Sequence, residues 1–174
     1  MAVKTNKEKK PLIKLNKNIG KKMDELEKKM AETDNLLVFP LTHRFTDGLY
    51  SREVTLGAGC LVTSKTHKVQ HQFFLLKGSV LVWNNEGDAQ HIQAPFVGIT
   101  EVGTRRVVYA IEESVWITCH PNPDNEILDV LESRVFEEYN NNLLTDDMKN
   151  RIKKAQKKSN KLSNTINTNL LKNN

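Results

Sequence analysis

Short apolar runs alternate with polar residues through the middle of the chain, a pattern typical of β-strands rather than helices. Turn-forming residues separate these runs about every eight to twelve residues, as they do in β-sandwiches and barrels. We expect strands at 49–56, 60–63, 67–76, 79–83, 90–93, 96–101, 106–111 and 114–120. A shorter apolar run at 36–39 reads as a strand or a linker that Pro40 ends. The pattern therefore predicts an all-β domain.

An amphipathic helix is expected before this region, at 17–33. The residues on its apolar stripe are Ile19, Met23, Leu26 and Met30. The stripe allows two interpretations of equal weight. The helix packs on the protein's own barrel, or it docks a partner chain and supports an oligomer or a protein assembly.

Helical spacing also follows the last expected strand. Asn122 or Asp124 is a candidate N-cap for a helix that ends near Tyr139. The apolar face of this helix would consist of Ile127, Leu128, Leu131 and Val135. A second helix is expected to begin at Thr145, with Met148, Ile152 and Ala155 at helical spacing.

These patterns divide the chain into four parts. Residues 1–34 form a basic arm and an amphipathic helix, residues 35–122 form the barrel, and residues 123–158 form a helical extension. Residues 159–174 are rich in lysine and asparagine, and we expect them to be disordered.

The net charge of +5 is an average over unlike segments. Residues 1–34 carry ten lysines and six acidic residues, and residues 149–174 carry eight basic residues and no acid. The intervening segment carries eight basic and fifteen acidic residues. A basic end can contact nucleic acid or an acidic protein face. No aromatic or arginine pattern accompanies the lysines, so a solvated tail is favoured over a nucleic acid contact.

The cysteines and the apolar content favour a cytoplasmic protein. Cys60 and Cys119 lie in expected strands without a CxxC pair, which is typical of buried, reduced thiols. A disulfide between them would need an oxidising compartment. The sequence has no run of about 18 apolar residues for a membrane span. The charged N-terminus lacks the apolar segment of a signal peptide.

Two histidines four residues apart are the first candidates for chemistry. On a strand, His67 and His71 would share one inward face with Phe73. Converging imidazoles bind divalent transition metals such as Zn, Fe, Mn or Ni, and His120 is a candidate third ligand. Glu53 is a candidate fourth. The alternative is a set of histidines that form hydrogen bonds without a metal.

The stretch around these histidines resembles the first motif of the cupins, in which His-x-His is followed by a glutamate and then by a glycine. Counting back from Gly78, His71 takes the glutamate position, His67 takes the second histidine, and Lys65 takes the first. The resemblance implies that His71 replaces glutamate as a nitrogen ligand and that a cation stands where one ligand is expected.

Residues 101–106 resemble the second cupin motif, Pro-x-Gly-x-x-His, with Arg106 in place of the histidine. The resemblance covers residues 45–120 and implies a cupin-like β-barrel of the jelly-roll type. Residues 43–53 and 103–110 are also similar to small cupin proteins encoded by bacteriophages. That closer resemblance implies a virion or host cytoplasm as the location.

Basic residues suggest a second use of the barrel interior. Guanidinium groups bind carboxylate or phosphate in a bidentate manner, so Lys65, Arg105 and Arg106 are candidates for holding a small anionic ligand. Alternation on a strand requires one of the two arginines to face solvent, and the sequence leaves open which one. Tyr109 would line the mouth of the barrel.

Two functional hypotheses follow. The first is a non-enzymatic binding or structural module, phage-encoded by resemblance, with a cationic and histidine-lined cavity. The second is a metal-dependent cupin enzyme, an oxygenase or isomerase, with His67 and His71 as metal ligands. The first is favoured because a cation beside a divalent metal is electrostatically unfavourable. No nucleophilic triad, phosphate loop or dinucleotide fingerprint supports a catalytic residue.

Overall fold

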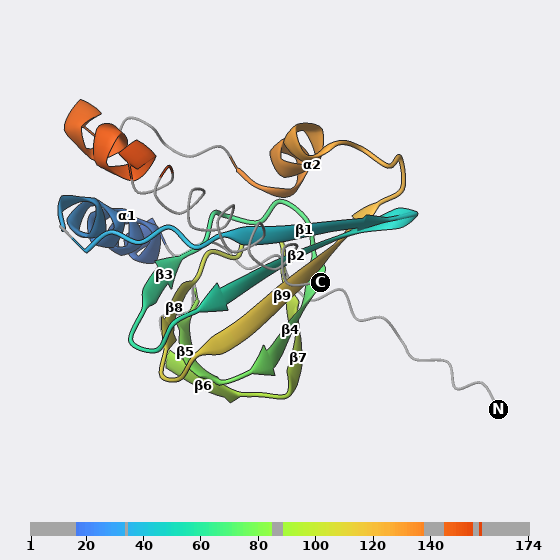
Figure 1. The fold of residues 1–174 in the computed structure, drawn as a ribbon, viewed down its shortest axis with the longest axis horizontal. Coiled ribbons are helices and arrows are strands. Elements are labelled where there is room, and N and C mark those ends of the chain that lie inside the picture. Colours follow the sequence, from blue (N-terminus) through green and yellow to red (C-terminus); the bar gives the residue numbers. More distant parts are fainter. Residues whose placement is uncertain (1–16, 34, 85–88, 138–144, 155–156, 158–174) are drawn as a thin grey trace, which may run out of the picture.

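Two antiparallel sheets face each other and close into a barrel in the computed structural model (Figure 1). The structure describes residues 17–33, 35–84, 89–137, 145–154 and 157. Its strands are β1 (Leu41–Thr46), β2 (Gly48–Leu56), β3 (Leu61–Thr63), β4 (His71–Lys77), β5 (Ser79–Trp83), β6 (Ala89–Gln93), β7 (Phe96–Thr100), β8 (Val107–Ala110) and β9 (Ser114–Asn122). Its helices include α1 (Lys17–Glu32) and α2 (Leu128–Val135).

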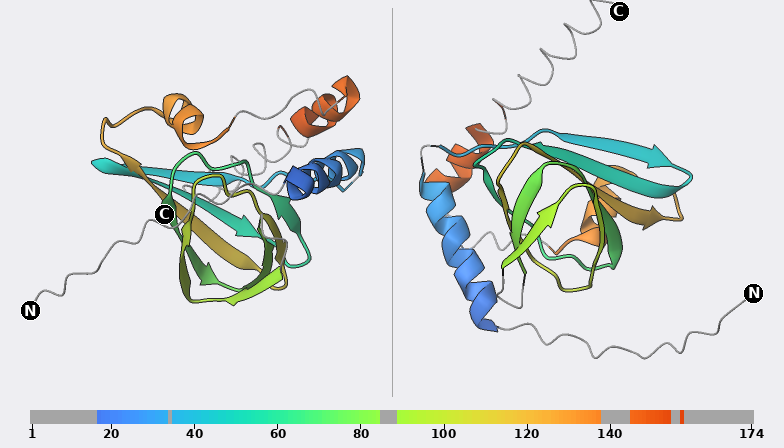
Figure 2. Two further views of the ribbon diagram at one scale, coloured as in Figure 1. Left: turned by 180° about the vertical axis from the view of Figure 1, so that it is seen from behind. Right: turned by 90° about the horizontal axis from the view of Figure 1, so that it is seen from below.

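The strand order is that of a jelly roll. One sheet has the order β1-β2-β9-β4-β7 and the other has the order β3-β8-β5-β6. Apart from the edge strand β1, these are the eight strands of a double-sheet jelly roll, the architecture of the cupins. The predicted fold class is therefore confirmed, and the barrel can be seen end-on in the right-hand view of Figure 2.

The core forms where the inner faces of the two sheets meet. Alternate residues of each strand face inward, as the period of two in their burial shows. The main core cluster consists of Leu56, Phe73, Leu75, Val80, Val82, Ile92, Val108, Ala110 and Trp116. Phe73 and Trp116 stack with ring centroids 4.5 Å apart, and Gly98 lies opposite Phe73 on β7. A Cβ at Gly98 would collide with the Phe73 ring, so glycine provides the room for this ring pair.

The strands differ from the expected ones in three places. The first strand is β1, which begins directly after Pro40 and was not expected, whereas residues 36–39 form no strand and are the linker of the two alternatives. The predicted strand at 67–76 begins only at His71, because residues 64–70 form a loop. The last strand extends through Pro121 to Asn122, and these two residues pair with Leu49 and Gly48 at the start of β2.

Helix α1 lies against the protein's own barrel. Its buried residues, Met23, Glu27 and Ala31, are four apart, whereas the expected Leu26 and Met30 are half-buried. Arg105 of the barrel binds α1 through Nη1, 2.6 Å from Asp24 Oδ1, and through Nη2, 2.8 Å from Glu27 Oε2. The helix therefore packs on the protein's own barrel, as in the first of the two interpretations. Docking of a partner chain stays a prediction.

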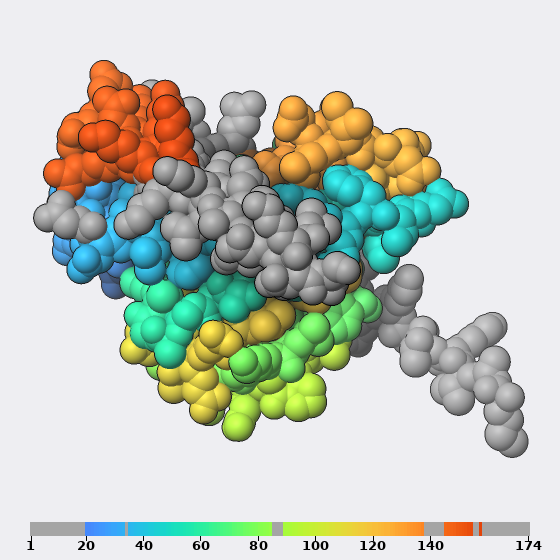
Figure 3. All heavy atoms as spheres, viewed as in Figure 1, coloured from blue at the N-terminus to red at the C-terminus, as the bar shows by residue number. Residues whose placement is uncertain are grey.

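The C-terminal extension folds back onto the rest of the molecule. Residues 146–154 form a helix that Thr145 caps, with Met148 N donating to Thr145 Oγ1 at 3.3 Å, as predicted. Figures 1 and 3 show this helix beside α1, where Arg151 Nη1 donates to Glu32 O at 3.0 Å. The predicted disordered tail at 159–174 and the basic arm at 1–16 lie outside the described residues.

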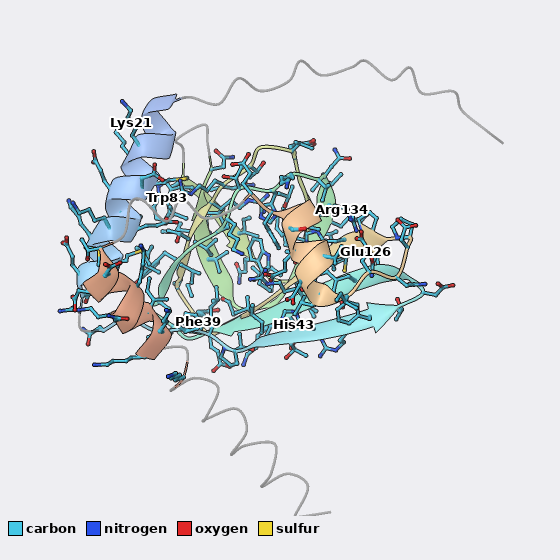
Figure 4. The ribbon with its side chains drawn as sticks, turned by 90° about the horizontal axis from the view of Figure 1, so that it is seen from above. Lys21, Phe39, His43, Trp83, Glu126 and Arg134 are labelled. Atoms are coloured by element: carbon cyan, nitrogen blue, oxygen red, sulfur yellow. The ribbon has the colours of Figure 1, made fainter. Side chains whose placement is uncertain are left out.

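Helix α2 covers one end of the barrel, as the view from above in Figure 4 shows. Neither predicted N-cap binds its first turn, because Ile127 occupies the N-cap position without a side-chain hydrogen bond. Asn122 instead bonds both backbone groups of Glu126. The helix ends at Val135, so the predicted end near Tyr139 is too late. Among the described residues, no helix is long and apolar enough to cross a membrane.

Candidate functional site

Two of the predicted histidines lie side by side on the inner face of the larger sheet. His71 begins β4 opposite Thr100 of β7, and His120 lies near the end of β9 opposite Tyr50 of β2. The His71 and His120 ring centroids are 4.2 Å apart, and both side chains are buried. The alternation of inward residues on β4 and β9 places both imidazoles in the barrel, as expected from sequence.

The third histidine, His67, lies beside the other two but belongs to a loop rather than to a strand. His67 was expected on the strand of His71, but it lies before β4 in an isolated β-bridge with Phe136. Its backbone also bonds Gly103 and Thr104 at 2.8 and 3.0 Å. The His67 ring centroid is 4.4 Å from that of His71. We call His67, His71 and His120 the histidine cluster.

Each member of the histidine cluster has a ring nitrogen without a hydrogen-bond partner. Within the described part of the chain, these buried atoms are His67 Nδ1, His71 Nε2 and His120 Nδ1. His71 Nδ1 lies 3.2 Å from Val69 O, and a carbonyl only accepts, so Nδ1 carries the proton. His71 Nε2 is therefore an unpaired lone pair. Buried polar atoms of this kind are rare in folded proteins and call for an explanation.

The histidine cluster is neutral at physiological pH. Burial lowers the pKa of His67 to about 2, with further lowering from the neighbouring His71 and Arg106. Burial lowers the pKa of His120 to about 3. Burial also lowers the pKa of His71 to about 4, against the opposing effect of the hydrogen bond to Val69. The cluster can therefore donate and accept hydrogen bonds without carrying charge of its own.

Arg106 is the arginine that turns into the barrel. Its Nη1 donates to Thr100 Oγ1 at 2.7 Å, and its guanidinium lies 4.6 Å from the Phe73 ring centroid and 6.0 Å from that of Trp116. Burial lowers the pKa of Arg106 to about 10. Among the described residues, no carboxylate forms an ion pair with this guanidinium. Arg106 is thus a largely desolvated cation held by aromatic faces and one hydroxyl group.

Two other predicted ligand residues lie elsewhere. Arg105 points outward and is bound to α1. Tyr109 lies on the outer face of β8, where it is exposed, while Val108 and Ala110 on either side face the core. The structure therefore groups Arg106 with the histidine cluster and leaves Arg105 and Tyr109 outside this group.

Lys65 lies at the end of the barrel that α2 covers. Its Nζ is 3.7 Å from Glu132 Oε2, and Arg52 Nη1 is 3.4 Å from Glu132 Oε1. Both cations also lie over the ring of Phe136, 5.2 Å away for Arg52 and 5.6 Å for Lys65. We call Arg52 and Lys65 the outer cation pair.

Residues 128–136, here called the closing segment, separate the outer cation pair from the histidine cluster. The Phe136 ring centroid is 5.1 Å from that of His67 and 5.8 Å from that of His120. Leu131 and Val135 are fully buried and pack with Tyr50. Lys68 N donates to Val135 O at 2.7 Å, which ties the segment to the loop before β4. The closing segment therefore covers the histidine cluster.

The histidine cluster offers nitrogen donors but, in the part of the chain that the structure describes, lacks further side chains that could complete a metal site. Three neutral imidazoles with unpaired nitrogens are suitable donors in kind. The described residues nevertheless include no group of three or more His, Cys, Asp or Glu side chains that could hold a metal ion. Glu53, the candidate fourth ligand, faces away from the cluster and pairs with Arg44 at 2.8 Å. We therefore derive no reaction step through a metal.

Sequence reasoning missed Phe136 and Glu132 of this site. Both belong to the C-terminal extension, which the sequence pattern separates from the barrel. Thr100 was also missed, although its place opposite His71 follows once β4 and β7 are paired. The signal that could have found Phe136 is an aromatic residue directly after the apolar face of a short helix.

No family model matches the sequence, and no curated protein matches it either. Several solved structures match the fold at low identity. A protein with a double-stranded β-helix domain from Klebsiella pneumoniae gives a TM-score of 0.45 at 13% identity, over 61% of this chain and 90% of that chain.

An RmlC-like cupin family protein from Methanocaldococcus jannaschii gives a TM-score of 0.42 at 8% identity, over 53% of this chain and 88% of that chain. A cupin superfamily protein from Desulfitobacterium hafniense gives 0.41 at 8% identity, over 51% and 80%. The strand order of the two sheets remains the basis for the conclusion that this chain folds as a jelly-roll β-barrel.

Proposed function

We propose that this chain is a non-enzymatic binding module that takes a small anionic ligand inside its barrel, with Arg106 as the anchor. The observation behind the proposal is the Arg106 guanidinium, which is largely desolvated and has no carboxylate partner among the described residues. Removing an unpaired cation from water costs desolvation free energy. A bound anion offsets this cost by pairing with the cation. Carboxylate and phosphate groups match the guanidinium fork.

The histidine cluster supports the same ligand. A neutral imidazole can donate one N–H hydrogen bond, and His67 Nδ1 and His120 Nδ1 are both buried without a partner in the described structure. An anion beside Arg106 would accept hydrogen bonds from such donors. The stacked Phe73 and Trp116 rings hold the guanidinium in place from the other side, so the site is organised before the ligand arrives.

The test is a titration of the purified chain with acetate, oxalate and inorganic phosphate in a zwitterionic buffer. Trp116 lies beside the guanidinium, so tryptophan fluorescence and calorimetry both report on the site. We expect Arg106→Gln to weaken binding by about 10- to 100-fold, the range for losing a charge-assisted hydrogen bond. Arg44→Gln is the matched control, because Arg44 pairs with Glu53 on the exposed face. Equal binding by Arg106→Gln and the wild type would refute the proposal.

A metal-dependent cupin enzyme, an oxygenase or isomerase, is the second candidate. The observation that favours it is His71 Nε2, a deprotonated and unpaired imidazole nitrogen, which is the form that binds a transition metal. Native mass spectrometry after gentle purification would reveal one Zn, Fe, Mn or Ni ion per chain, and His71→Ala should remove it. If none of these ions raises the melting temperature of the wild type, this candidate fails.

The phage resemblance adds a structural role to the first candidate. Residues 43–53 and 103–110 carry that resemblance, and the proposal is that the barrel belongs to a virion or accessory assembly held by its terminal helices. Deletion of residues 1–34 should then change the oligomeric mass of the protein in solution. If the full-length protein and the variant that lacks residues 1–34 both have the mass of a monomer, the assembly role is refuted.

A further inference from the structure

The ion pairs that hold the closing segment differ in strength. Arg134 Nε binds Glu126 Oε2 at 2.7 Å, and Arg134 Nη2 donates to Pro121 O at 2.7 Å. These short contacts anchor the segment to the end of β9, and Figure 4 shows the labelled Arg134 and Glu126 beside α2. The contacts of Glu132 with the outer cation pair, at 3.4 and 3.7 Å, are long. Long and partly exposed ion pairs contribute little stability, so Glu132 is readily displaced.

The outer cation pair does not depend on Glu132 for its position. Arg52 extends from the inner face of β2, opposite Thr118 of β9, and its guanidinium lies over the Phe136 ring. Lys65 lies over the same ring. Cation–π contacts with this ring keep both charges together when the carboxylate leaves. The outer cation pair is therefore a preformed anion site that Glu132 now fills.

The outer cation pair also faces the histidine cluster. Burial lowers the pKa of both His67 and His120, and the positive charge of Arg52 lowers it further. The Phe136 ring is a neighbour of both groups, with its centroid 5.1 Å from that of His67, 5.8 Å from that of His120, 5.2 Å from the Arg52 guanidinium and 5.6 Å from Lys65 Nζ. An anion bound between Arg52 and Lys65 would therefore lie close to the histidine cluster.

We infer that Glu132 is a built-in competitor of the anionic ligand. Its carboxylate occupies the outer cation pair, and an incoming anion takes its place before entering the barrel. This inference rests on the proposed function, because it concerns access to the same site. It assigns Glu132 a role in setting the affinity of the protein for the ligand. Glu132 has this role without contacting Arg106.

The test compares the full-length wild type with Glu132→Gln and with Glu126→Gln. Glu126 is the matched control because it lies beside the same closing segment but pairs with Arg134. Titration with oxalate and with inorganic phosphate should give a dissociation constant about three- to tenfold lower for Glu132→Gln, from the loss of weak, partly exposed ion pairs. Glu126→Gln should bind as the wild type does.

The outcomes separate the two proposals. If the wild type binds and Glu132→Gln binds equally well or more weakly, the competitor role is refuted while the anion site stands. If no variant binds either probe, both proposals fail. If Glu132→Gln does not fold by circular dichroism, Glu132→Asp replaces it. The shorter carboxylate cannot span both cations, so this variant should also bind more tightly, and unchanged affinity would refute the inference.

Discussion

At the scale of single residues, two adjacent arginines have opposite roles. Arg105 binds Asp24 and Glu27 of α1, and Glu27 is buried. Arg106 is enclosed in the barrel, where its guanidinium contacts a hydroxyl group and two aromatic rings. One residue therefore contributes to the fold, and the other costs stability in the absence of a ligand.

This difference predicts opposite changes in stability. Arg106→Met should raise the melting temperature of the ligand-free protein, because an unpaired and desolvated charge is replaced by an apolar side chain. Arg105→Met should lower the unfolding free energy by about 3 kcal/mol, because it removes a partner of the buried Glu27. Thermal and urea unfolding of both variants measure this. A lower melting temperature for Arg106→Met would mean that its cation–π contacts outweigh the cost of burial.

At the scale of elements, apolar packing contributes more to holding the closing segment than the long contacts of Glu132 do. Leu131 and Val135 are fully buried against Tyr50, whereas Ile127 at the N-cap is 70% exposed. The helix has only eight residues and lacks a side-chain cap, so it is not stable by itself. Its position over the barrel therefore depends on a few buried side chains.

Replacing one of these side chains should destabilise the closing segment over the histidine cluster. Leu131→Ala should lower the unfolding free energy by about 2 to 4 kcal/mol, because a fully buried leucine leaves a cavity. Ile127→Ala, at the exposed end of the same element, should stay within about 0.5 kcal/mol of the wild type. Hydrogen exchange should show faster exchange in α2 for Leu131→Ala alone. Equal exchange in the two variants would contradict this account of the segment.

At the scale of the whole molecule, three neutral histidines make the folded state sensitive to acid. Their pKa values in the folded protein are about 2, 4 and 3, well below the ordinary value of 6.5. Below pH 6.5 the unfolded chain takes up protons that the folded barrel does not, so the unfolding free energy falls as the pH falls. The loss continues until the pH reaches the lowered pKa values.

We therefore expect a steep fall in stability between pH 6.5 and pH 4. Each histidine contributes up to about 1.4 kcal/mol per pH unit in this window. Thermal melts from pH 7.5 to pH 4.5 measure the effect, and His120→Gln should flatten the dependence by removing one of the three groups. A melting temperature that stays constant from pH 7.5 to pH 5 would show that the histidine cluster is not buried as described.

Much of this fold could be predicted from local patterns. Alternation of apolar and polar residues located β5 and β6 closely, because a strand with one buried face repeats every two residues. The inward faces of His71 and His120 followed from the same period. The strand β1 was missed, because the sequence LTHRFT carries few apolar residues at the exposed edge of the sheet.

The sequence by itself determined the all-β class, the eight central strands and the presence of histidines and cations near one another in the chain. These features follow from side-chain periodicity and turn residues, which act over a few positions. Only the tertiary structure decided that Arg106 turns inward, that His67 arrives from a loop, and that Phe136 and Glu132 cover the cluster. The bridge between His67 and Phe136 joins residues far apart in the chain, and such contacts depend on how the strands are ordered rather than on any local pattern.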